Sequence, residues 1–452
     1  MNDMSNYQLR NTILDVLIRI EKDSGFSHLI LDHEIKMNKM NPKDEGLLTE
    51  VVYGTIQRQL TLDYYIDSFV TQKKKLDDWV RMLLRMSIYQ MTFLDKVPDH
   101  AIIHEAVEIA KKRGHKGSAS FVNGVLRNVQ RKGVPKTEAI QSDSKRLAIE
   151  TSHPQWLVER WINAYGYETA KEICEENLNR KAITVRVQPL KIDRDEAMQI
   201  LNEQGFEVSP SAFSTQGIIV EKGNVLKTKL FKEGYITIQD QSSMLVAEML
   251  DVKPDMHVLD ACSAPGGKAT HIAEKMQDKG TIDAYDLHKK KVKLIDNKAS
   301  ELDLSIINAD TADARQLQTI HSNESFDRIL VDAPCSGLGV IRGKPEIKYH
   351  KQESDIQRLA IIQLDILESV APLLKKNGLI VYSTCTVDTE ENEHVVKKFL
   401  KRNENYEIDH KFFEELPGHL EGSQGITEAG IQLFPQSFGT DGFFLTRLIR
   451  IK

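Results

Sequence analysis

The sequence predicts an α/β protein in which a parallel, doubly wound sheet follows an all-helical domain and a small α/β module. Three observations predict this order. Apolar residues recur at helical spacing through residues 1–130, strand-like runs alternate with glycine turns through 150–235, and short apolar strands alternate with longer helices from about residue 255. The 452 residues, 40% hydrophobic and 28% charged, are typical of a globular protein with two or three domains.

The first predicted domain, residues 1–145, is helical. Apolar side chains at 13–18 and 82–89 follow the helical period. Pro98 is placed to begin a further helix, AIIHEAVEIAKKRG, and Gly114 to end it before a last helix, FVNGVLRNVQRKG. We therefore expect a helical bundle at the start of the chain.

The second predicted domain, residues 146–235, is a small mixed module. HPQWLVERWINAYG predicts an amphipathic helix whose Trp156 and Trp161 belong to the core, and AITVRVQPL, GFEVSP, GIIVEKG and GYITIQD predict strands. No motif assigns it a role, and a spacer and an RNA platform both remain open.

The third predicted domain, residues 236–452, carries the parallel sheet. The sequence predicts five buried strands separated by helices, and FFLTRLIRI as a last strand. The five strands are HVLDAC, TIDAYD, LSIINA, RILVDA and LIVYST. Sheets of this kind bind ligands beyond the carboxyl ends of their strands, near the point where the strand order reverses. The sequence therefore predicts the active site at these strand ends.

Charge and cysteine content exclude several classes of protein. A formal net charge of −6 excludes a polycation that wraps nucleic acid by bulk charge. Four cysteines without a CxxC pair predict neither a disulfide scaffold nor a zinc site, so we expect no metal. The start lacks the apolar segment of a signal peptide, and no run approaches the ~20 apolar residues of a membrane span, so we expect a cytoplasmic protein without a membrane partner.

The charge is unevenly distributed along the chain. Residues 1–145 carry 22 basic and 19 acidic side chains, a charge of +3, and the remainder carries 38 and 47, a charge of −9. Basic side chains are concentrated at 111–117 and 127–133, and these two stripes either contact phosphates or form an ordinary solvated helix face. The same two interpretations apply to a second basic segment, which contains Arg342, Lys344, Lys348 and Lys351.

A sharp turn follows the first strand of the third domain and opens a helix. Its glycines would let a nucleotide-like ligand approach the backbone. The turn lacks the spacings of a P-loop and of GxGxxG, which argues against a nicotinamide cofactor. The candidate cofactor residues in this turn are Cys262, Ser263, Ala264, Pro265, Gly266, Gly267 and Lys268.

Acidic residues end several strands of the same sheet. Asp286 comes 19 residues after Gly267, where this fold class holds a ribose hydroxyl, and Asp310 is placed to meet a base edge. Each acid alone is more typical of a helix cap or a surface residue. Three strands that end in an acid at one sheet edge favour an adenosine-type cofactor.

Two cysteines also follow strands of this sheet. Cys335 comes after Asp332-Ala-Pro, and Cys385 after Ser-Thr; if the strands are neighbours ~5 Å apart, both thiols open onto one cleft. Either cysteine alone is more typical of a small buried residue. Together they fit methyl transfer to carbon 5 of a pyrimidine. In that reaction one thiolate adds to carbon 6, an acid protonates or hydrogen-bonds N3, and a second thiol can assist release of the product.

Five segments carry a resemblance to known families. HEAVEIAKKRG and SASFVNGVLRNV resemble the RNA-binding protein NusB, and DACSAPGGKAT, VDAPCSGLGVIR and VYSTCTVDTEENE resemble the RNA cytosine-5 methyltransferases. Together they resemble the Sun/Fmu type, which acts on 16S ribosomal RNA. The resemblance implies a Rossmann-like S-adenosylmethionine-dependent methyltransferase sheet behind a NusB-like domain. It also implies 16S rRNA or a small-subunit precursor as partner, and we expect a monomer that does not act on DNA.

The resemblance also implies residue roles. Cys385 is the nucleophile, Cys335 assists product release and Asp332 supports the cytosine ring, while Lys268 contacts the target nucleotide or caps the cofactor loop. Spacing alone does not show which cysteine is the nucleophile. In the DNA cytosine methyltransferases the nucleophile is the cysteine of the Pro-Cys motif, which in this chain would be Cys335. The implied S-adenosylmethionine site comprises Cys262 to Lys268 with Asp286, Asp310 and Asp332. The alternative function is an RNA-binding assembly or antitermination factor with a non-catalytic methyltransferase scaffold.

Overall fold

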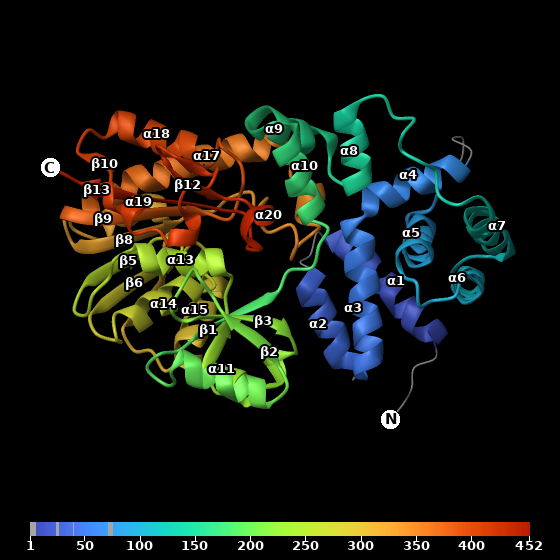
Figure 1. The fold of residues 1–452 in the computed structure, drawn as a ribbon, viewed down its shortest axis with the longest axis horizontal. Helices are drawn as coiled ribbons and strands as arrows, with labels where there is room; N and C mark the ends of the chain where they lie inside the picture. Colours follow the sequence, from blue (N-terminus) through green and yellow to red (C-terminus); the bar gives the residue numbers. More distant parts are fainter. Residues whose placement is uncertain (1–5, 24–26, 39, 71–75) are drawn as a thin grey trace. The chain divides into compact units, whose positions relative to one another are not determined.

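A computed structural model describes residues 6–23, 27–38, 40–70 and 76–452 (Figure 1). The described chain packs as two compact units that divide between Asn179 and Arg180. The segment Ile341–Lys351 packs with the first unit although it interrupts the second in sequence. The predicted boundaries near 145 and 235 do not coincide with this division and remain a hypothesis about folding modules.

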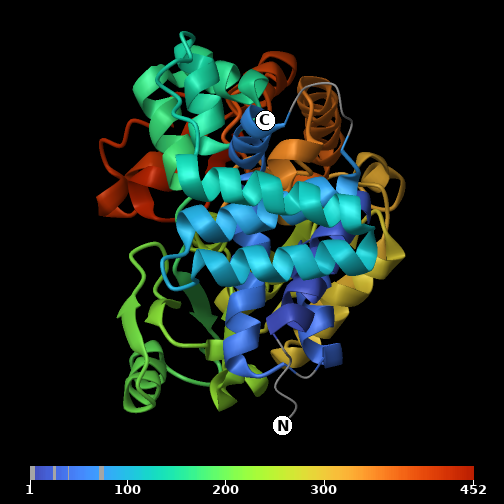
Figure 2. The same cartoon turned by 90° about the vertical axis from the view of Figure 1, so that its right-hand side faces the viewer.

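The first unit is helical, as the apolar spacing predicts. Apolar side chains of its first seven helices, such as Leu83 and Leu126, form one core. Helices α6 and α7 lie side by side across the front of Figure 2. The helices are α1 Asn6–Asp23, α2 Ser27–Asn38, α3 Pro42–Gln57, α4 Gln59–Phe69, α5 Asp78–Phe93, α6 Asp99–Arg113, α7 Lys116–Lys132, α8 Asp143–Thr151, α9 Gln155–Tyr165, α10 Tyr167–Glu176 and α16 Ile347–His350.

The second unit begins with a small antiparallel sheet of strand order β2-β3-β1-β4. Its four strands lie within the predicted runs, and Val185, Ile218 and Ile236 from three of them form a core under helix α11. The elements are β1 Ile183–Val187, α11 Arg194–Glu203, β2 Glu207–Pro210, β3 Gly217–Lys222, η1 Val225–Lys227, α12 Lys229–Lys232 and β4 Ile236–Ile238.

The large sheet of the second unit has the order β11-β12-β13-β9-β8-β5-β6-β7, with β10 paired to β13. Strands β5 to β9 are parallel, and the later strands are antiparallel. The strand order reverses between β5 and β8. The strands are β5 His257–Asp260, β6 Thr281–Asp286, β7 Ile307–Thr311, β8 Phe326–Asp332, β9 Leu374–Thr384, β10 Tyr406–Ile408, β11 Ile426–Thr427, β12 Gly430–Leu433 and β13 Phe443–Arg450.

Helices cover both faces of this sheet, as a doubly wound topology requires (Figure 1). Helices α13 and α14 pack on one face, and α17 and α18 on the other. The helices are α13 Gln241–Met249, α14 Gly267–Lys275, α15 Lys289–Glu301, η2 Ala314–Thr319, α17 Glu353–Val370, η3 Ala371–Leu373, α18 Glu393–Arg402, α19 Lys411–Glu414, η4 Gly418–Leu420 and α20 Pro435–Phe438. None of the described helices is both long and apolar enough to cross a membrane.

The sequence-based fold class is confirmed, including the last strand, β13. The short strands β10, β11 and β12 were not predicted, because two to four residues carry too little periodicity to read. Part of the predicted helical segment, at 1–5, 24–26, 39 and 71–75, lies outside the described residues.

The phosphate-binding interpretation of the second basic segment is wrong for two of its residues. Lys348 is fully buried, and its Nζ donates to the Gln57 carbonyl at 2.9 Å. Burial lowers the pKa of Lys348 to about 7. Arg342 is also buried and pairs with Glu176 at 2.5 Å. Charge in the sequence could not reveal that these side chains point into the helical unit.

Candidate active site

A cavity of about 400 Å³ opens at the carboxyl ends of the parallel strands, where the strand order reverses. Ligand sites of doubly wound sheets lie at such points, and this volume suits a small cofactor. The predicted site residues that line it are Cys262, Ala264, Asp286, Asp332, Cys335 and Cys385. The sequence therefore located this cavity correctly.

The loop after β5 is shaped to leave its backbone open to a ligand. Gly266 has φ +96° and begins α14, and a Cβ there would lie 3.0 Å from the Ile295 Cα. A Cβ at Gly267 would meet nothing within 4 Å, so free space adjoins the loop there. The Ser263 N–H donates to the Tyr285 carbonyl at 2.7 Å and ties the loop to β6. Within this loop, Cys262 and Ala264 line the cavity and can contact a cofactor there. The other predicted loop residues, Ser263, Pro265, Gly266, Gly267 and Lys268, do not line it.

Acidic side chains from the next two strands have different positions. Asp286 lines the cavity at the end of β6 and accepts from the His288 N–H at 3.0 Å. Asp310 is exposed on β7 and does not line the cavity, because the strand continues to Thr311 before the chain turns. The acid that lines it is Asp313, which caps η2 and pairs with Arg315 at 2.6 Å. Sequence analysis missed Asp313, although its place before a short helix is a typical cap signal.

Lys268 and Asp332 form an ion pair beside the thiols. The Lys268 Nζ lies 2.7 Å from the Asp332 Oδ2, and the Ser383 hydroxyl donates to the other carboxylate oxygen at 2.9 Å. Burial alone would lower the pKa of Lys268, but Asp332 and Cys385 outweigh burial, and the pKa is raised. Lys268 is therefore a cation at neutral pH. Its Nζ also lies 5.3 Å from the centre of the Phe443 ring.

The two thiols lie in contact. Strands β8 and β9 are parallel neighbours with Asp332 opposite Ser383, so Cys335 and Cys385 leave the sheet side by side. Their sulfur atoms are 3.3 Å apart. The hydrogen bond to Cys385 and burial raise the pKa of the Cys335 thiol well above its ordinary value. Cys335 therefore keeps its proton at neutral pH.

Buried polar side chains hold the chain on both sides of Cys335. Glu391 accepts from the Ser336 N–H at 2.8 Å and from its hydroxyl, and Gln363 donates to the Pro334 carbonyl and to Glu391, both at 3.0 Å. The Ser336 and Thr386 hydroxyl groups, each directly after one cysteine, are 2.9 Å apart. Sequence analysis missed these residues, because only folding brings α17 and the acidic turn after β9 together.

Glu391 is expected to make folding stability depend on pH. Burial raises its pKa from 4.5 to about 7, so the folded state holds a proton between these pH values that the unfolded state has lost. Stability due to this group therefore falls as pH rises through that window, by up to about 1 kcal/mol per pH unit. In Glu391→Gln, the free energy of unfolding should change less with pH between 5 and 8, as measured by urea denaturation followed by circular dichroism. The control Glu404→Gln, at an exposed site, should keep the wild-type dependence on pH. A wild-type dependence on pH in Glu391→Gln would refute the assignment.

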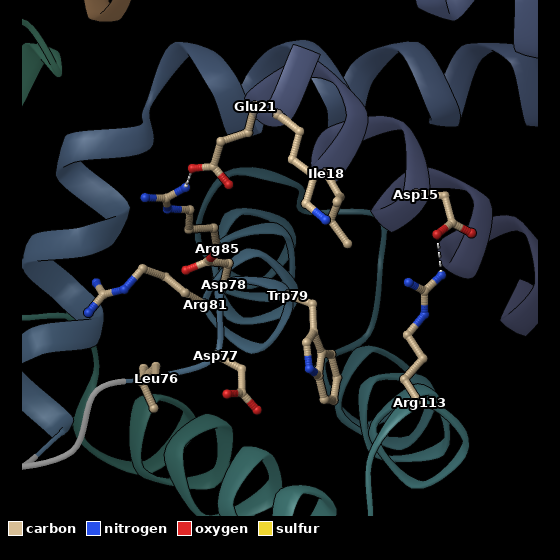
Figure 3. Close-up of a pocket in the computed structure, with 11 residues that line it drawn as sticks. Asp15, Ile18, Glu21, Leu76, Asp77, Asp78, Trp79, Arg81, Arg85 and Arg113 are labelled. Carbon is tan, nitrogen blue, oxygen red and sulfur yellow. Dashed lines mark hydrogen bonds and ion pairs between the residues drawn. The ribbon is translucent and has the colours of Figure 1, made fainter. Parts of the chain in front are cut away.

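A larger cavity, of about 1190 Å³, lies in the helical unit (Figure 3). Four acidic and four basic side chains line it together with Trp79. Its arginines are engaged by carboxylates: Arg85 binds Glu21 at 2.9 Å, and Arg113 binds Asp15 at 2.6 Å. It brings no nucleophile near a base, so we place the active site in the second unit. Among the described residues, no group of three or more His, Cys, Asp or Glu is arranged to hold a metal ion.

Comparisons with known proteins agree with this geometry. A 16S rRNA methyltransferase RsmB/F family model matches residues 247–449, a NusB family model matches 7–131, and an RsmF/B-like ferredoxin-like domain model matches 153–226. A probable ribosomal RNA small subunit methyltransferase B of Bacillus subtilis is 49% identical over 442 residues, 98% of each chain. The chain belongs to the RsmB/F family of rRNA methyltransferases.

A second curated relative and a solved structure are similar over nearly the whole chain. The ribosomal RNA small subunit methyltransferase B of Pseudomonas syringae is 33% identical over 95% of this chain and 94% of its own. A crystal structure of PH0851 is 26% identical, covers 99% of this chain and 100% of its own, and superposes with a TM-score of 0.83. The predicted combination of a NusB-like helical domain and an RsmB/F methyltransferase sheet is therefore confirmed.

Proposed function

We propose that this rRNA methyltransferase transfers a methyl group from S-adenosylmethionine to carbon 5 of a cytosine in 16S rRNA. The observation that carries the proposal is the pair of thiols 3.3 Å apart in a cavity bordered by the Lys268–Asp332 ion pair. Carbon 5 of cytosine is a weak nucleophile, and only a covalent adduct at carbon 6 makes it reactive. A thiol at a strand end beside a cofactor loop suits that chemistry.

The charges around the thiols favour Cys385 as the nucleophile. Cys335 holds its proton because it is buried and hydrogen-bonded to Cys385, and Asp332 and Glu391 add negative charge near it. Cys385 instead interacts with the Lys268 cation, which favours a thiolate. The two residues therefore differ in environment although their positions in the sheet are alike.

The proposed reaction proceeds through a covalent adduct on Cys385. The Cys385 thiolate adds to carbon 6 of cytosine, and the electron pair moves to carbon 5. The Lys268 cation offsets the negative charge that develops at N3, and the Asp332 carboxylate orients the ring by accepting a hydrogen bond from its amino group. S-adenosylmethionine supplies the methyl group when bound. Carbon 5 then loses its proton to a water molecule, and the electron pair of that bond expels the Cys385 thiolate and restores the ring. The protonated Cys335 thiol assists this release by donating a hydrogen bond to the leaving Cys385 sulfur, 3.3 Å away.

The cofactor would be held by the loop after β5 and by two strand ends. We assign the ribose to Asp286, as the sequence predicts, and the base edge to Asp313 in place of Asp310, because only Asp313 lines the cavity. Asp332 lies between the cofactor loop and the thiols and can contact both reactants. The exposed Leu287 adds an apolar wall for the adenine ring.

The RNA substrate would contact the basic part of the helical unit. Except for the half-buried Arg113, the basic side chains in the stripes at 111–117 and 127–133 are exposed at the end of α6 and on α7, where phosphate groups can reach them. The exposed residues are Lys111, Lys112, Lys116, Arg127, Arg131 and Lys132. The target base must be unpaired or flipped out of its stack to enter the cavity. We propose 16S rRNA or a small-subunit precursor as the substrate, and a monomer as the acting form.

The proposal is tested by the position of the methyl group. The full chain, incubated with methyl-labelled S-adenosylmethionine and unmodified small-subunit RNA, should give label that survives nuclease digestion as 5-methylcytosine. Bisulfite sequencing of rRNA from cells with and without the protein should then show one protected cytosine. Label at an exocyclic nitrogen, or no label on RNA or on precursor subunits, would overturn the proposal and favour a non-catalytic scaffold.

A further inference from the structure

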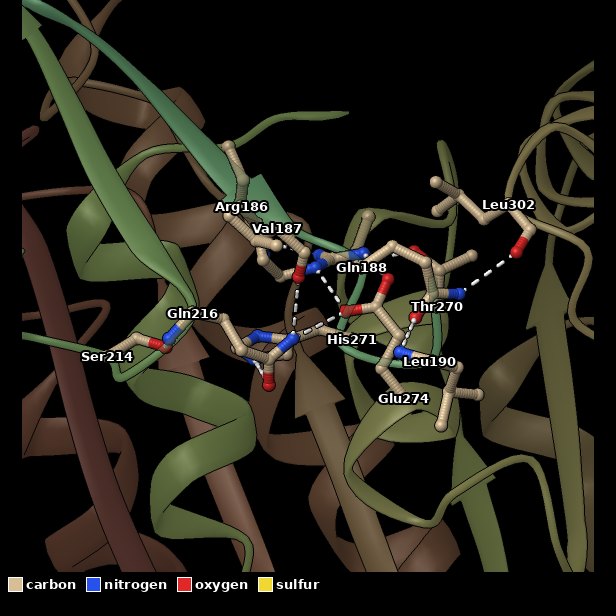
Figure 4. Close-up of polar contacts among 12 residues, drawn as sticks. Arg186, Val187, Gln188, Leu190, Ser214, Gln216, Thr270, His271, Glu274 and Leu302 are labelled. Atoms are coloured by element: carbon tan, nitrogen blue, oxygen red, sulfur yellow. Dashed lines mark hydrogen bonds and ion pairs between the residues drawn. The ribbon is translucent and has the colours of Figure 1, made fainter. Parts of the chain in front are cut away.

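One buried arginine joins the small sheet to the helix that follows the cofactor loop. Arg186 lies on β1, and its side chain and that of Glu274 on α14 are both fully buried. The guanidinium binds the carboxylate with two hydrogen bonds, Nε to Oε2 at 2.7 Å and Nη2 to Oε1 at 2.9 Å (Figure 4). This is the bidentate geometry that arginine provides and lysine does not.

The same guanidinium reaches the first turn of α14. Its Nη1 donates to the Gly267 carbonyl at 2.7 Å and to the Gln239 side chain, and its Nη2 donates to the Thr270 hydroxyl at 3.0 Å. With the two bonds to Glu274, all five N–H groups of the arginine are used. Gly267 directly precedes Lys268, so Arg186 holds the backbone that carries the Lys268 side chain.

Neighbouring side chains complete the network and keep it free of a second cation. The Gln216 side-chain amide donates to Glu274 at 2.7 Å and to the Val187 carbonyl at 3.1 Å, and its oxygen lies 3.2 Å from the His271 Nε2 (Figure 4). Burial and the charge of Arg186 lower the pKa of His271 well below its ordinary value, so His271 is neutral and donates from Nε2.

A second contact links the same end of β1 to the next helix. The Gln188 side chain donates to the Leu302 carbonyl, which follows α15, at 2.9 Å (Figure 4). Asp303, the next residue, pairs with Lys191 at 2.6 Å. The small sheet is thus bonded to both helices that flank the cofactor loop in the fold, and α15 carries the Ile295 against which Gly266 packs.

We propose that Arg186 is a positioning residue for methyl transfer, which fixes the Gly267 backbone and thereby Lys268 and the cofactor loop. The proposal rests on the proposed function and deepens it by giving the small sheet a role: it holds the loop in its reactive shape. A buried ion pair stabilises a fold little compared with apolar residues of similar size. Its five directed bonds instead specify one position for the loop, and misplacement by about 1 Å can cost about 100-fold in rate.

Three variants of the full chain separate an effect on loop position from an effect on stability. Arg186→Met alone leaves Glu274 as a buried, unpaired charge, whereas the double variant Arg186→Met/Glu274→Met replaces the pair by apolar side chains and should unfold near the wild-type temperature. The double variant should still lose about 100-fold in kcat/KM. Arg186→Lys keeps the charge but not the fork of donors, and should not rescue activity.

A matched control is available on the same compact unit. Arg447 is buried like Arg186 and binds Asp409 at 2.6 Å, Glu415 at 2.7 Å and the Met249 carbonyl at 3.0 Å. Arg447→Met should lower the unfolding temperature without changing the kcat/KM of the remaining folded protein. It therefore reports the effect of losing a buried arginine that does not bind the turn of α14.

Hydrogen–deuterium exchange gives a readout that does not require activity. In the double variant, amides of residues 262–270 should exchange faster while those of β9 stay protected, and Arg447→Met should not produce this local pattern. Native kcat/KM and native exchange at 262–270 in the double variant would overturn the positioning role. If the wild-type chain transfers no methyl group to RNA, the proposed function fails, and the exchange comparison still decides whether Arg186 fixes the loop.

Discussion

Replacement of Cys385 by alanine is expected to abolish methyl transfer, with a loss of about 10⁴-fold or more in kcat. Without a thiolate to add to carbon 6, carbon 5 of cytosine lacks the electron density to attack the methyl group. Cys335 cannot substitute, because burial and its hydrogen bond raise the pKa of its thiol. The measurement is transfer of labelled methyl to small-subunit RNA at saturating concentrations of both substrates.

The control for this prediction is Cys174→Ala. Cys174 is fully buried in the helical unit, where burial raises the pKa of its thiol to about 12, so its loss should leave transfer unchanged. Full activity in Cys385→Ala together with inactivity in Cys335→Ala would reassign the nucleophile to Cys335. Full activity in both variants would exclude a covalent route.

Replacement of Cys335 by alanine is expected to trap the enzyme on its RNA. The Cys385 thiolate can still add to carbon 6 and methyl transfer can still follow, but the group 3.3 Å away that assists elimination is gone. The protein–RNA adduct should survive denaturing electrophoresis and amount to a substantial fraction of the enzyme after one turnover, while steady-state turnover nearly ceases.

The adduct must depend on Cys385. The double variant Cys335→Ala/Cys385→Ala should show none, and nuclease digestion of the adduct should leave one modified nucleotide on Cys385 by mass spectrometry. Fast turnover without an adduct in Cys335→Ala would show that Cys335 has no part in release. An adduct on another residue would exclude the proposed division of labour between the thiols.

The residues that follow strands were the most readable part of the site. In a parallel sheet the carboxyl ends share one edge, so Asp286, Asp332, Cys335 and Cys385 could be placed in one cavity from sequence, and all four line it. The local pattern placed Asp310 at the end of its strand, but β7 continues to Thr311 and Asp310 does not line the cavity. The end of a strand depends on where it separates from its neighbour, which the local sequence does not show. The cavity acid three residues later, Asp313, carries only a helix-cap signal in the sequence, and its position in the cavity depends on the fold.

The sequence by itself determined the fold class, the helical first unit and the strand-end side chains that line the cavity, because hydrophobic periodicity and strand-end motifs are local signals. Tertiary structure alone decided that burial and a hydrogen bond raise the pKa of the Cys335 thiol, that Glu391 and Gln363 hold the chain around Cys335, and that Lys348 is buried. It alone brought Arg186 to the first turn of α14, 81 residues away. These features depend on burial and on contacts between distant segments, which no local pattern of residues records.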